Sequence, residues 1–275
     1  GNLTSKTACS VKLNEAGSLA ELIQLIEAGL SMRFPDVDAI CFGSAGQYNG
    51  ETLEHENPYP YSMHFAALAK EQNWPPFAII HDYAPILCAT FTSYMHQPSN
   101  IIELHPSATM NPYGRRVTLG LGTGLGMKDG ALLSDGNFWL GQNEIGHTGI
   151  TFPPSATSAE TKLHLELIEF LQKKYPTAVT FEKILSGPGT VNLYEFFYPD
   201  REQLSPEETG IAMREGKTPE LENAFAWYLG LLVGTLQLGF MPEGGIWMTG
   251  GVALNHQNIF KLDSFFAGIN ASPAY

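Results

Sequence analysis

An aspartate stands at the end of a short apolar run, where it could meet a substrate. The apolar run 77–80 predicts a buried strand, and His81 and Asp82 follow it directly. Open α/β sheets bind their ligands beyond the carboxyl ends of their strands. A carboxylate at that place can accept a proton from a substrate hydroxyl. Asp82 is therefore a candidate general base, and the alternative is that it only caps a helix or a turn.

A second candidate is a loop of alternating glycines. Gly122, Thr123, Gly124 and Gly126 follow the predicted strand 116–121. Alternating glycines leave backbone N–H groups free to approach a phosphate, and Thr123 adds a hydroxyl. By itself the pattern is more typical of an ordinary tight turn. It is not a Walker motif, because no Gly-Lys-Ser/Thr follows, and no clear helix follows to make a dinucleotide fingerprint.

Glu144 and His147 lie three residues apart on a glycine-bearing turn, so both could face one polar ligand. The HExxH pattern of metalloproteases is absent. The alternative is a solvated Glu144 and a His147 that forms local hydrogen bonds.

Two other turns are rich in glycine. The rigid turn 185–189 is preceded by Glu182 and predicts a helix from about Thr190. The run 247–251 predicts a strand that ends in Gly250 and Gly251, whose bare backbone could accept an adenine or a ribose. Either turn could also be a plain connection.

The elements that must position these residues alternate between strands and helices, which predicts an α/β fold. Ser18 and Glu21 form a capping-box pattern in front of an amphipathic helix. Thr218 and Pro219 predict the start of a long apolar helix that reaches about residue 240. The remaining expected strands are 37–42, ended by the turn 43–46, and 244–248, and the remaining expected helices are 61–71 and 157–175.

Composition narrows the class of protein. The chain has 275 residues, enough for one large or two modest domains, and a net charge of −13. That charge disfavours a nucleic-acid or anionic-membrane partner, because such binders carry a basic face. The three cysteines are widely spaced and form no CxxC pair. No apolar run reaches the ~18 residues of a membrane span, and the first residues are polar. We therefore expect a reduced, cytoplasmic protein.

Together, these segments resemble the bacterial ATP-dependent glucokinases. The run from Glu182 through Leu185-Ser186-Gly187-Pro188-Gly189 to Tyr194 is the most specific match to that family. Four other segments match in the same order along residues 6–260, namely 80–83, 122–126, 141–147 and 249–251.

The resemblance implies the two-lobe α/β fold of the actin-like (ribonuclease H-like) ATPases, with sugar in the cleft between a small and a large domain and ATP on the larger one. We place the small domain at residues 1–91, with its first strands apparently missing, and the large domain at 92–275. A homodimer is also implied.

The resemblance also implies roles for the candidate residues in phosphorylating glucose to glucose 6-phosphate. Asp82 would be the general base toward the 6-hydroxyl. The sugar would be bound by Asp82 together with His81, Glu144, His147 and Glu182. Gly122, Thr123, Gly124 and Gly126 would bracket the ATP phosphates through backbone N–H groups, and Gly250 and Gly251 would lie against the adenosine. Mg²⁺ would bridge the phosphates, with no metal ligand assigned to this chain.

The sequence departs from the family in three places. His81 replaces an asparagine, which leaves the sugar preference open. The opening Asp-x-Gly-Gly-Thr loop is not found, and the family's last strands and helix are not found after residues 250–251. The chain is then either a fragment, which we favour, or a natural remnant that binds sugar and phosphorylates poorly. The rival functions are accordingly a non-catalytic sugar-binding or regulatory protein and a kinase for another hexose. Zinc-containing relatives are disfavoured, because Cys9, Cys41 and Cys88 cannot form their cysteine cluster.

Overall fold

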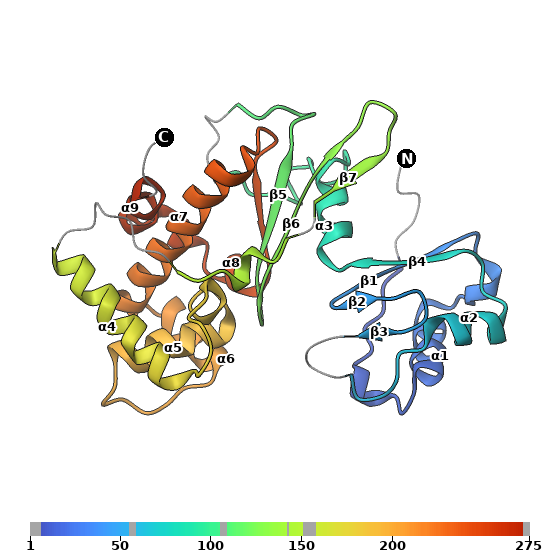
Figure 1. Ribbon diagram of the computed structural model, residues 1–275, viewed down its shortest axis with the longest axis horizontal. Helices are drawn as coiled ribbons and strands as arrows, with labels where there is room; N and C mark the ends of the chain where they lie inside the picture. Colours follow the sequence, from blue (N-terminus) through green and yellow to red (C-terminus); the bar gives the residue numbers. More distant parts are fainter. Residues whose placement is uncertain (1–6, 55–58, 105–108, 142, 151–157, 272–275) are drawn as a thin grey trace. The chain divides into compact units, whose positions relative to one another are not determined.

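The chain divides into two units, Gly1–Gln97 and Pro98–Tyr275, each with its own hydrophobic core. The computed structural model describes residues 7–54, 59–104, 109–141, 143–150 and 158–271 (Figure 1). The boundary follows Gln97, whereas the sequence analysis placed it after residue 91.

The first unit is built around two parallel strands. β1 (Ile40–Ser44) pairs with β4 (Phe77–His81), and the register sets Ser44 beside His81. The strand expected at 77–80 is thus confirmed and extends by one residue. β2 (Gln47–Tyr48) and β3 (Leu53–Glu54) pair with each other as a separate small hairpin, and the Tyr48 ring of β2 packs against the Phe77 ring of β4.

Three helices complete the first unit: α1 (Leu19–Leu30), α2 (Phe65–Gln72) and α3 (Tyr83–Thr90). Ser18 caps α1 as expected, since its hydroxyl accepts from the N–H of Glu21 at 3.2 Å. The carboxylate of Glu21 accepts from the N–H of Gly17 at 2.7 Å, one residue before the position that a capping box uses. Aromatic rings cluster beside the buried aliphatic residues of the core, where Phe42 contacts the rings of Phe34, Phe65 and Trp74.

The second unit contains a four-stranded sheet in the order β7-β6-β5-β8. β5 (Arg116–Leu121) is antiparallel to β6 (Leu125–Leu132), which pairs with β7 (Phe138–Leu140), and is parallel to β8 (Ile246–Thr249). All six residues of β5 are buried, as expected for a central strand covered on both faces.

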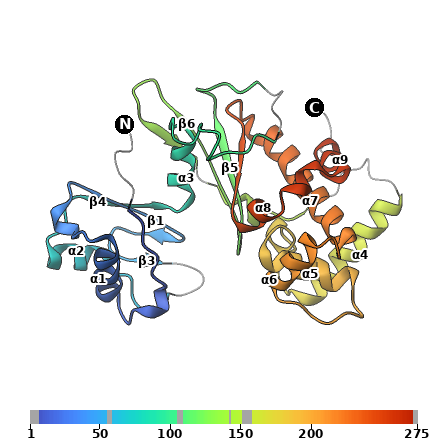
Figure 2. The same cartoon turned by 180° about the vertical axis from the view of Figure 1, so that it is seen from behind.

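Helices cover this sheet, and α7 (Pro219–Phe240) is the most deeply buried of them. It begins at Pro219 as the sequence predicted, although the Thr218 side chain bonds the Glu222 carboxylate rather than capping the helix. Figures 1 and 2 both show α9 beside α7. The other helices are α4 (Ser158–Lys174), α5 (Gly187–Phe197), α6 (Pro206–Arg214), α8 (Gly251–Asn255) and α9 (Asp263–Ala271).

Short 3₁₀ turns connect these elements, at Leu13–Glu15, Phe34–Asp36, Ile145–His147 (η3), Phe181–Lys183 (η4) and Gln257–Lys261. The expected start of α4, Thr157, lies outside the described residues. Of the helices that the structure describes, none is long and apolar enough to cross a bilayer.

Candidate active site

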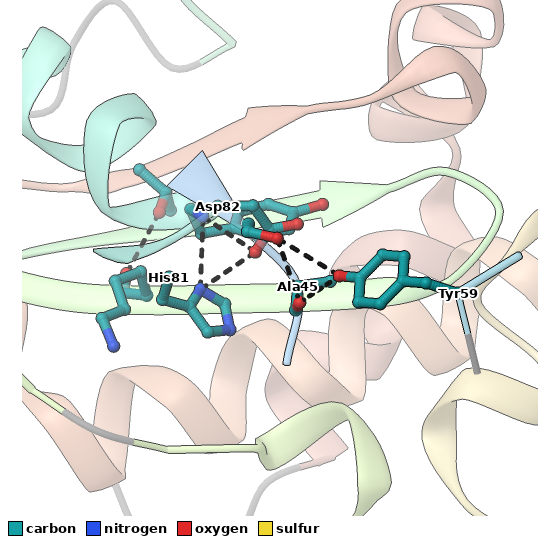
Figure 3. Close-up of polar contacts among 8 residues, drawn as sticks. Ala45, Tyr59, His81 and Asp82 are labelled. Atoms are coloured by element: carbon teal, nitrogen blue, oxygen red, sulfur yellow. Dashed lines mark hydrogen bonds and ion pairs between the residues drawn. The ribbon is translucent and has the colours of Figure 1, made fainter. Parts of the chain in front are cut away.

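Asp82 lies at the carboxyl end of β4, where the strand turns into α3 (Figure 3). Its backbone N–H donates to the carbonyl of Ser44 at 3.1 Å, which continues the pairing of β1 with β4. Its carboxylate accepts from the N–H of Tyr83 at 3.0 Å, so it caps α3. The side chain nevertheless remains 41% exposed. Both interpretations of Asp82 from the sequence are therefore compatible, because the residue caps a helix and its side chain remains accessible.

His81 lies close enough to orient this carboxylate. Its Nδ1 is 3.1 Å from Oδ1 of Asp82 and 3.2 Å from the backbone nitrogen of Tyr83. A ring nitrogen that carries a proton can donate to Asp82, whereas one with a free lone pair accepts from Tyr83. The tautomer of His81 thus decides whether the histidine holds the carboxylate.

Tyr83 is excluded as a competing base by its surroundings. Burial, and secondly the charge of Asp82, raise the pKa of its phenol above the ordinary value. The phenol therefore stays protonated at neutral pH, and Asp82 remains the candidate base at this strand end.

Two hydroxyls beside Asp82 were missed by the sequence analysis. Tyr59 donates to the carbonyl of Ala45 at 2.6 Å, and its oxygen lies 3.2 Å from Oγ of Ser44 (Figure 3). Ser44 could have been found from its place in the glycine turn that ends a strand. Tyr59 follows a segment outside the described residues, and no local pattern marks it.

In the second unit, the glycine loop joins β5 to β6 as a tight hairpin. The N–H of Gly122 donates to the carbonyl of Gly124 at 3.0 Å, and the N–H of Gly187 donates to the carbonyl of Gly122 at 2.7 Å. The N–H of Gly122, expected to bind phosphate, is therefore already used within the loop. Within the described chain, no acceptor bonds the N–H groups of Thr123 and Gly124. These two groups are the donors that the loop offers to an anion.

Glu182 contacts this loop directly. Its Oε2 accepts from the N–H of Leu125 at 3.1 Å, and a methyl group at Gly124 would come within 2.9 Å of the same oxygen. The Glu182 carbonyl accepts from the hydroxyl of Ser186, which caps α5. A residue expected to bind sugar therefore braces a loop expected to bind phosphate, which local sequence patterns did not indicate.

Glu144 directly precedes the η3 turn and His147 is its last residue, and both residues are exposed. Two backbone hydrogen bonds join this segment to the one that carries Glu182, from Phe181 to Thr148 and from Ile150 to Val179, both at 3.2 Å. The three residues expected to bind sugar in this unit are thus on neighbouring segments.

Gly250 and Gly251 are brought to the base of the glycine loop by the parallel pairing of β8 with β5. Gly250 has φ +94°, and a Cβ there would lie 2.3 Å from the carbonyl oxygen of Leu121. Only glycine fits this position. Gly251 begins α8, and among the described residues no atom beyond its chain neighbours and its own helix backbone lies within 4 Å of where its Cβ would be, so the space is open.

The expected site residues fall into two sets, with His81 and Asp82 in the first unit and the others in the second. Among the described residues, no group of three or more His, Cys, Asp and Glu side chains could hold a metal ion.

Comparison with known proteins identifies the family. The glucokinase family matches residues 2–274. A glucokinase from Saccharophagus degradans is 28% identical over 235 residues, which cover 82% of this chain and 68% of the relative. A glucokinase from Nitrobacter hamburgensis is 32% identical over 234 residues, which cover 80% of this chain and 67% of the relative.

Solved structures agree on the fold. The glucokinase of an Antarctic psychrotroph superposes with a TM-score of 0.72 at 18% identity, covering 94% of this chain and 78% of that one. The Balamuthia mandrillaris glucokinase, solved with glucose, superposes with a TM-score of 0.70 at 20% identity, covering 92% of this chain and 74% of that one. A Streptomyces griseus ROK-family glucokinase, solved with glucose and AMPPNP, superposes with a TM-score of 0.54 at 15% identity, covering 94% of this chain and 78% of that one. The expected actin-like ATPase fold is confirmed, and by its match along residues 2–274 this chain belongs to the glucokinase family.

Proposed function

We propose that this chain transfers the γ-phosphoryl group of ATP to the 6-hydroxyl of glucose. The observation that carries the proposal is the family match across nearly the whole chain. The contact between Glu182 and the N–H of Leu125 supports it, because it joins a sugar-binding carboxylate to the glycine loop.

In this reaction Asp82 is the general base. As the sugar oxygen bonds to the γ-phosphorus, its proton passes to the Asp82 carboxylate, the bond to the β–γ bridging oxygen breaks, and ADP leaves. The half-exposed carboxylate at a strand end is suited to this step. His81, with its Nδ1 protonated, donates to the same carboxylate and keeps it oriented.

The sugar and the nucleotide are held by separate sets of groups. Glu144, His147 and Glu182 bond the sugar hydroxyls, and His81 contributes from the first unit. Gly122, Thr123, Gly124 and Gly126 form the phosphate loop, in which the N–H groups of Thr123 and Gly124 are the free donors. Gly250 and Gly251 lie against the adenosine.

The nucleotide is taken up as its Mg²⁺ complex, in which the ion neutralises charge on the phosphates. The described residues offer no carboxylate cluster for this ion, so none of them is assigned as its ligand.

We further propose that the protein is a cytoplasmic homodimer that supplies glucose 6-phosphate to glycolysis and binds no nucleic acid. The support is the net charge of −13 and the resemblance to bacterial glucokinases. Light scattering after gel filtration measures the assembly, and a monomer mass would contradict the dimer.

The activity is tested by a coupled ADP-release assay with MgATP and a panel of hexoses. Turnover with glucose supports the proposal. Turnover with a different hexose alone would identify another sugar kinase, the alternative suggested by His81. Glucose binding by calorimetry without turnover on any hexose would leave the non-catalytic sugar-binding function instead.

A further inference from the structure

The geometry points to Asp129 as a positioning residue for the sugar site, although no motif marks it. We propose that its buried carboxylate holds the segment that carries Glu144 and His147, and thereby sets the affinity for glucose. The inference rests on the proposed function, because that function assigns the two residues to the sugar.

Asp129 lies in the middle of β6 and is only 1% exposed. Its Oδ1 accepts from Nδ2 of Asn143 at 2.6 Å, and its Oδ2 accepts from Nε of Arg115 at 2.8 Å and from Nη2 of the same guanidinium. Its backbone carbonyl accepts from the N–H of Gly141 at 2.9 Å. One residue thus binds Gly141 through its backbone and Asn143 through its side chain.

The cation on the other side of Asp129 is itself fixed. The Arg115 guanidinium lies 5.1 Å from the ring centre of Trp139 and 4.8 Å from that of Phe240, and it also donates to the Phe240 carbonyl. These contacts come from β7 and from the end of α7. The contacts of Arg115 therefore hold the Asp129 carboxylate in place independently of its bond to Asn143.

The segment fits closely around this carboxylate. A Cβ at Gly141 would lie 2.2 Å from Oδ1 of Asp129, so only glycine allows the approach. The carboxylate accepts and cannot donate, which fixes the Asn143 amide with its nitrogen toward Asp129. Asn143 directly precedes Glu144, so this bond restrains the backbone that carries the sugar-binding carboxylate.

Asp129 is buried, whereas the Arg115 side chain is 34% exposed, and the desolvation of the buried carboxylate offsets much of the attraction between them. Its useful effect here is orientation. Binding sites need their groups held to within about 0.5 Å, and exposed side chains such as Glu144 and His147 reach that precision only when their backbone is fixed.

The test uses Asn143→Ala, which removes the bond to the segment and leaves the Arg115–Asp129 pair intact. We expect the KM for glucose to rise about tenfold, since a hydrogen bond to a charged group is lost. The kcat and the KM for MgATP should change by less than about twofold. Hydrogen exchange should become faster in peptides that cover residues 140–148 and stay unchanged elsewhere.

Asn137→Ala is a matched control, because Asn137 also donates its Nδ2 to an aspartate, Asp135, but in the exposed turn between β6 and β7. It should leave the KM for glucose and the exchange of residues 140–148 unchanged. Asp129→Asn gives a second measurement of the KM for glucose and of the exchange, because an amide cannot accept from both Asn143 and Arg115 as the carboxylate does. If that variant fails to fold, Asn143→Ala decides alone.

Glu144→Gln separates this inference from the proposed function. If Glu144→Gln weakens glucose binding and Asn143→Ala does not, the positioning role is wrong. If Glu144→Gln has no effect on glucose, the sugar role of the segment is wrong, and the exchange data alone show whether Asp129 holds it. Equal losses of kcat/KM for MgATP and for glucose would indicate general damage and would overturn the inference.

Discussion

At the scale of single residues, the proposed function gives the Asp82 carboxylate a chemical task besides its structural one. Its Oδ1 caps α3 by accepting from the N–H of Tyr83. Asparagine is an equally good N-cap, because its amide oxygen accepts the same bond. An amide, however, cannot take a proton from a hydroxyl at neutral pH. The two tasks can therefore be separated by one substitution.

We expect Asp82→Asn to lower kcat by about 10²–10⁴-fold, the usual contribution of a general base. Glucose affinity and the melting temperature should remain close to those of the parent protein, because the cap is kept. Steady-state kinetics and calorimetric titration with glucose measure the two effects. Unchanged turnover would remove Asp82 as the base.

Glu182 allows a sharper separation, because two substitutions remove different parts of its role. In Glu182→Gln the amide oxygen can still accept from the N–H of Leu125, while the charge that the proposed function directs at the sugar is lost. We expect this variant to raise the KM for glucose at least tenfold and to leave that for MgATP nearly unchanged.

Glu182→Ala removes the brace on the glycine loop as well, so the KM values for both substrates should rise. Glu169→Ala is the control, since Glu169 is exposed and pairs only along its own helix with Lys173. If Glu182→Gln and Glu182→Ala changed the KM for MgATP equally, the contact with Leu125 would not support the nucleotide site.

At the scale of elements, the first turn of α7 contains a carboxyl group whose ionised form is disfavoured by its surroundings. Glu222 is only 8% exposed, and burial raises the pKa of its carboxyl above the ordinary value against the opposing hydrogen bonds from Asn258 and Thr218. A carboxyl with a raised pKa in the fold costs stability once it is ionised. That cost is absent below the unfolded pKa of about 4.3, grows as pH rises through the folded value, and is constant above it.

We therefore expect Glu222→Gln to raise the melting temperature at pH 7 and to lose this advantage as pH falls toward 4. The amide can keep both partners, accepting from Asn258 and donating to the Thr218 hydroxyl. Each 1 kcal/mol gained in the free energy of unfolding raises the melting temperature by about 2–4 °C in a protein of this size. Scanning calorimetry across the pH range measures the difference, and an advantage that grows toward acid pH would contradict the assigned sign.

Most elements could be predicted from the sequence because their signals are local. β4 follows from its apolar run, and α7 from the proline at its first position. The contacts that organise the site could not be predicted in this way. Asp129 meets Asn143 across 14 residues, and Glu182 meets Leu125 across 57. Such pairs depend on how strands and turns pack together, which no local pattern encodes.

At the scale of the whole chain, a net charge of −13 has to be reconciled with an anionic substrate. A site built on lysine and arginine would gain affinity from long-range attraction and lose it as salt screens that attraction. Here the donors assigned to the phosphates are backbone N–H groups of the glycine loop. Their attraction is short-ranged, whereas the overall field of the protein repels the nucleotide.

Raising the ionic strength from about 0.01 M to 0.1 M shortens the Debye length from about 30 Å to about 10 Å. The KM for MgATP should then fall or stay within about twofold, because salt screens the repulsion more than the short hydrogen bonds. Glucose is neutral and serves as the control substrate, whose KM should not change over the same range of KCl at constant Mg²⁺. A several-fold rise in the KM for MgATP alone would show that a basic surface, rather than the glycine backbone, attracts the nucleotide.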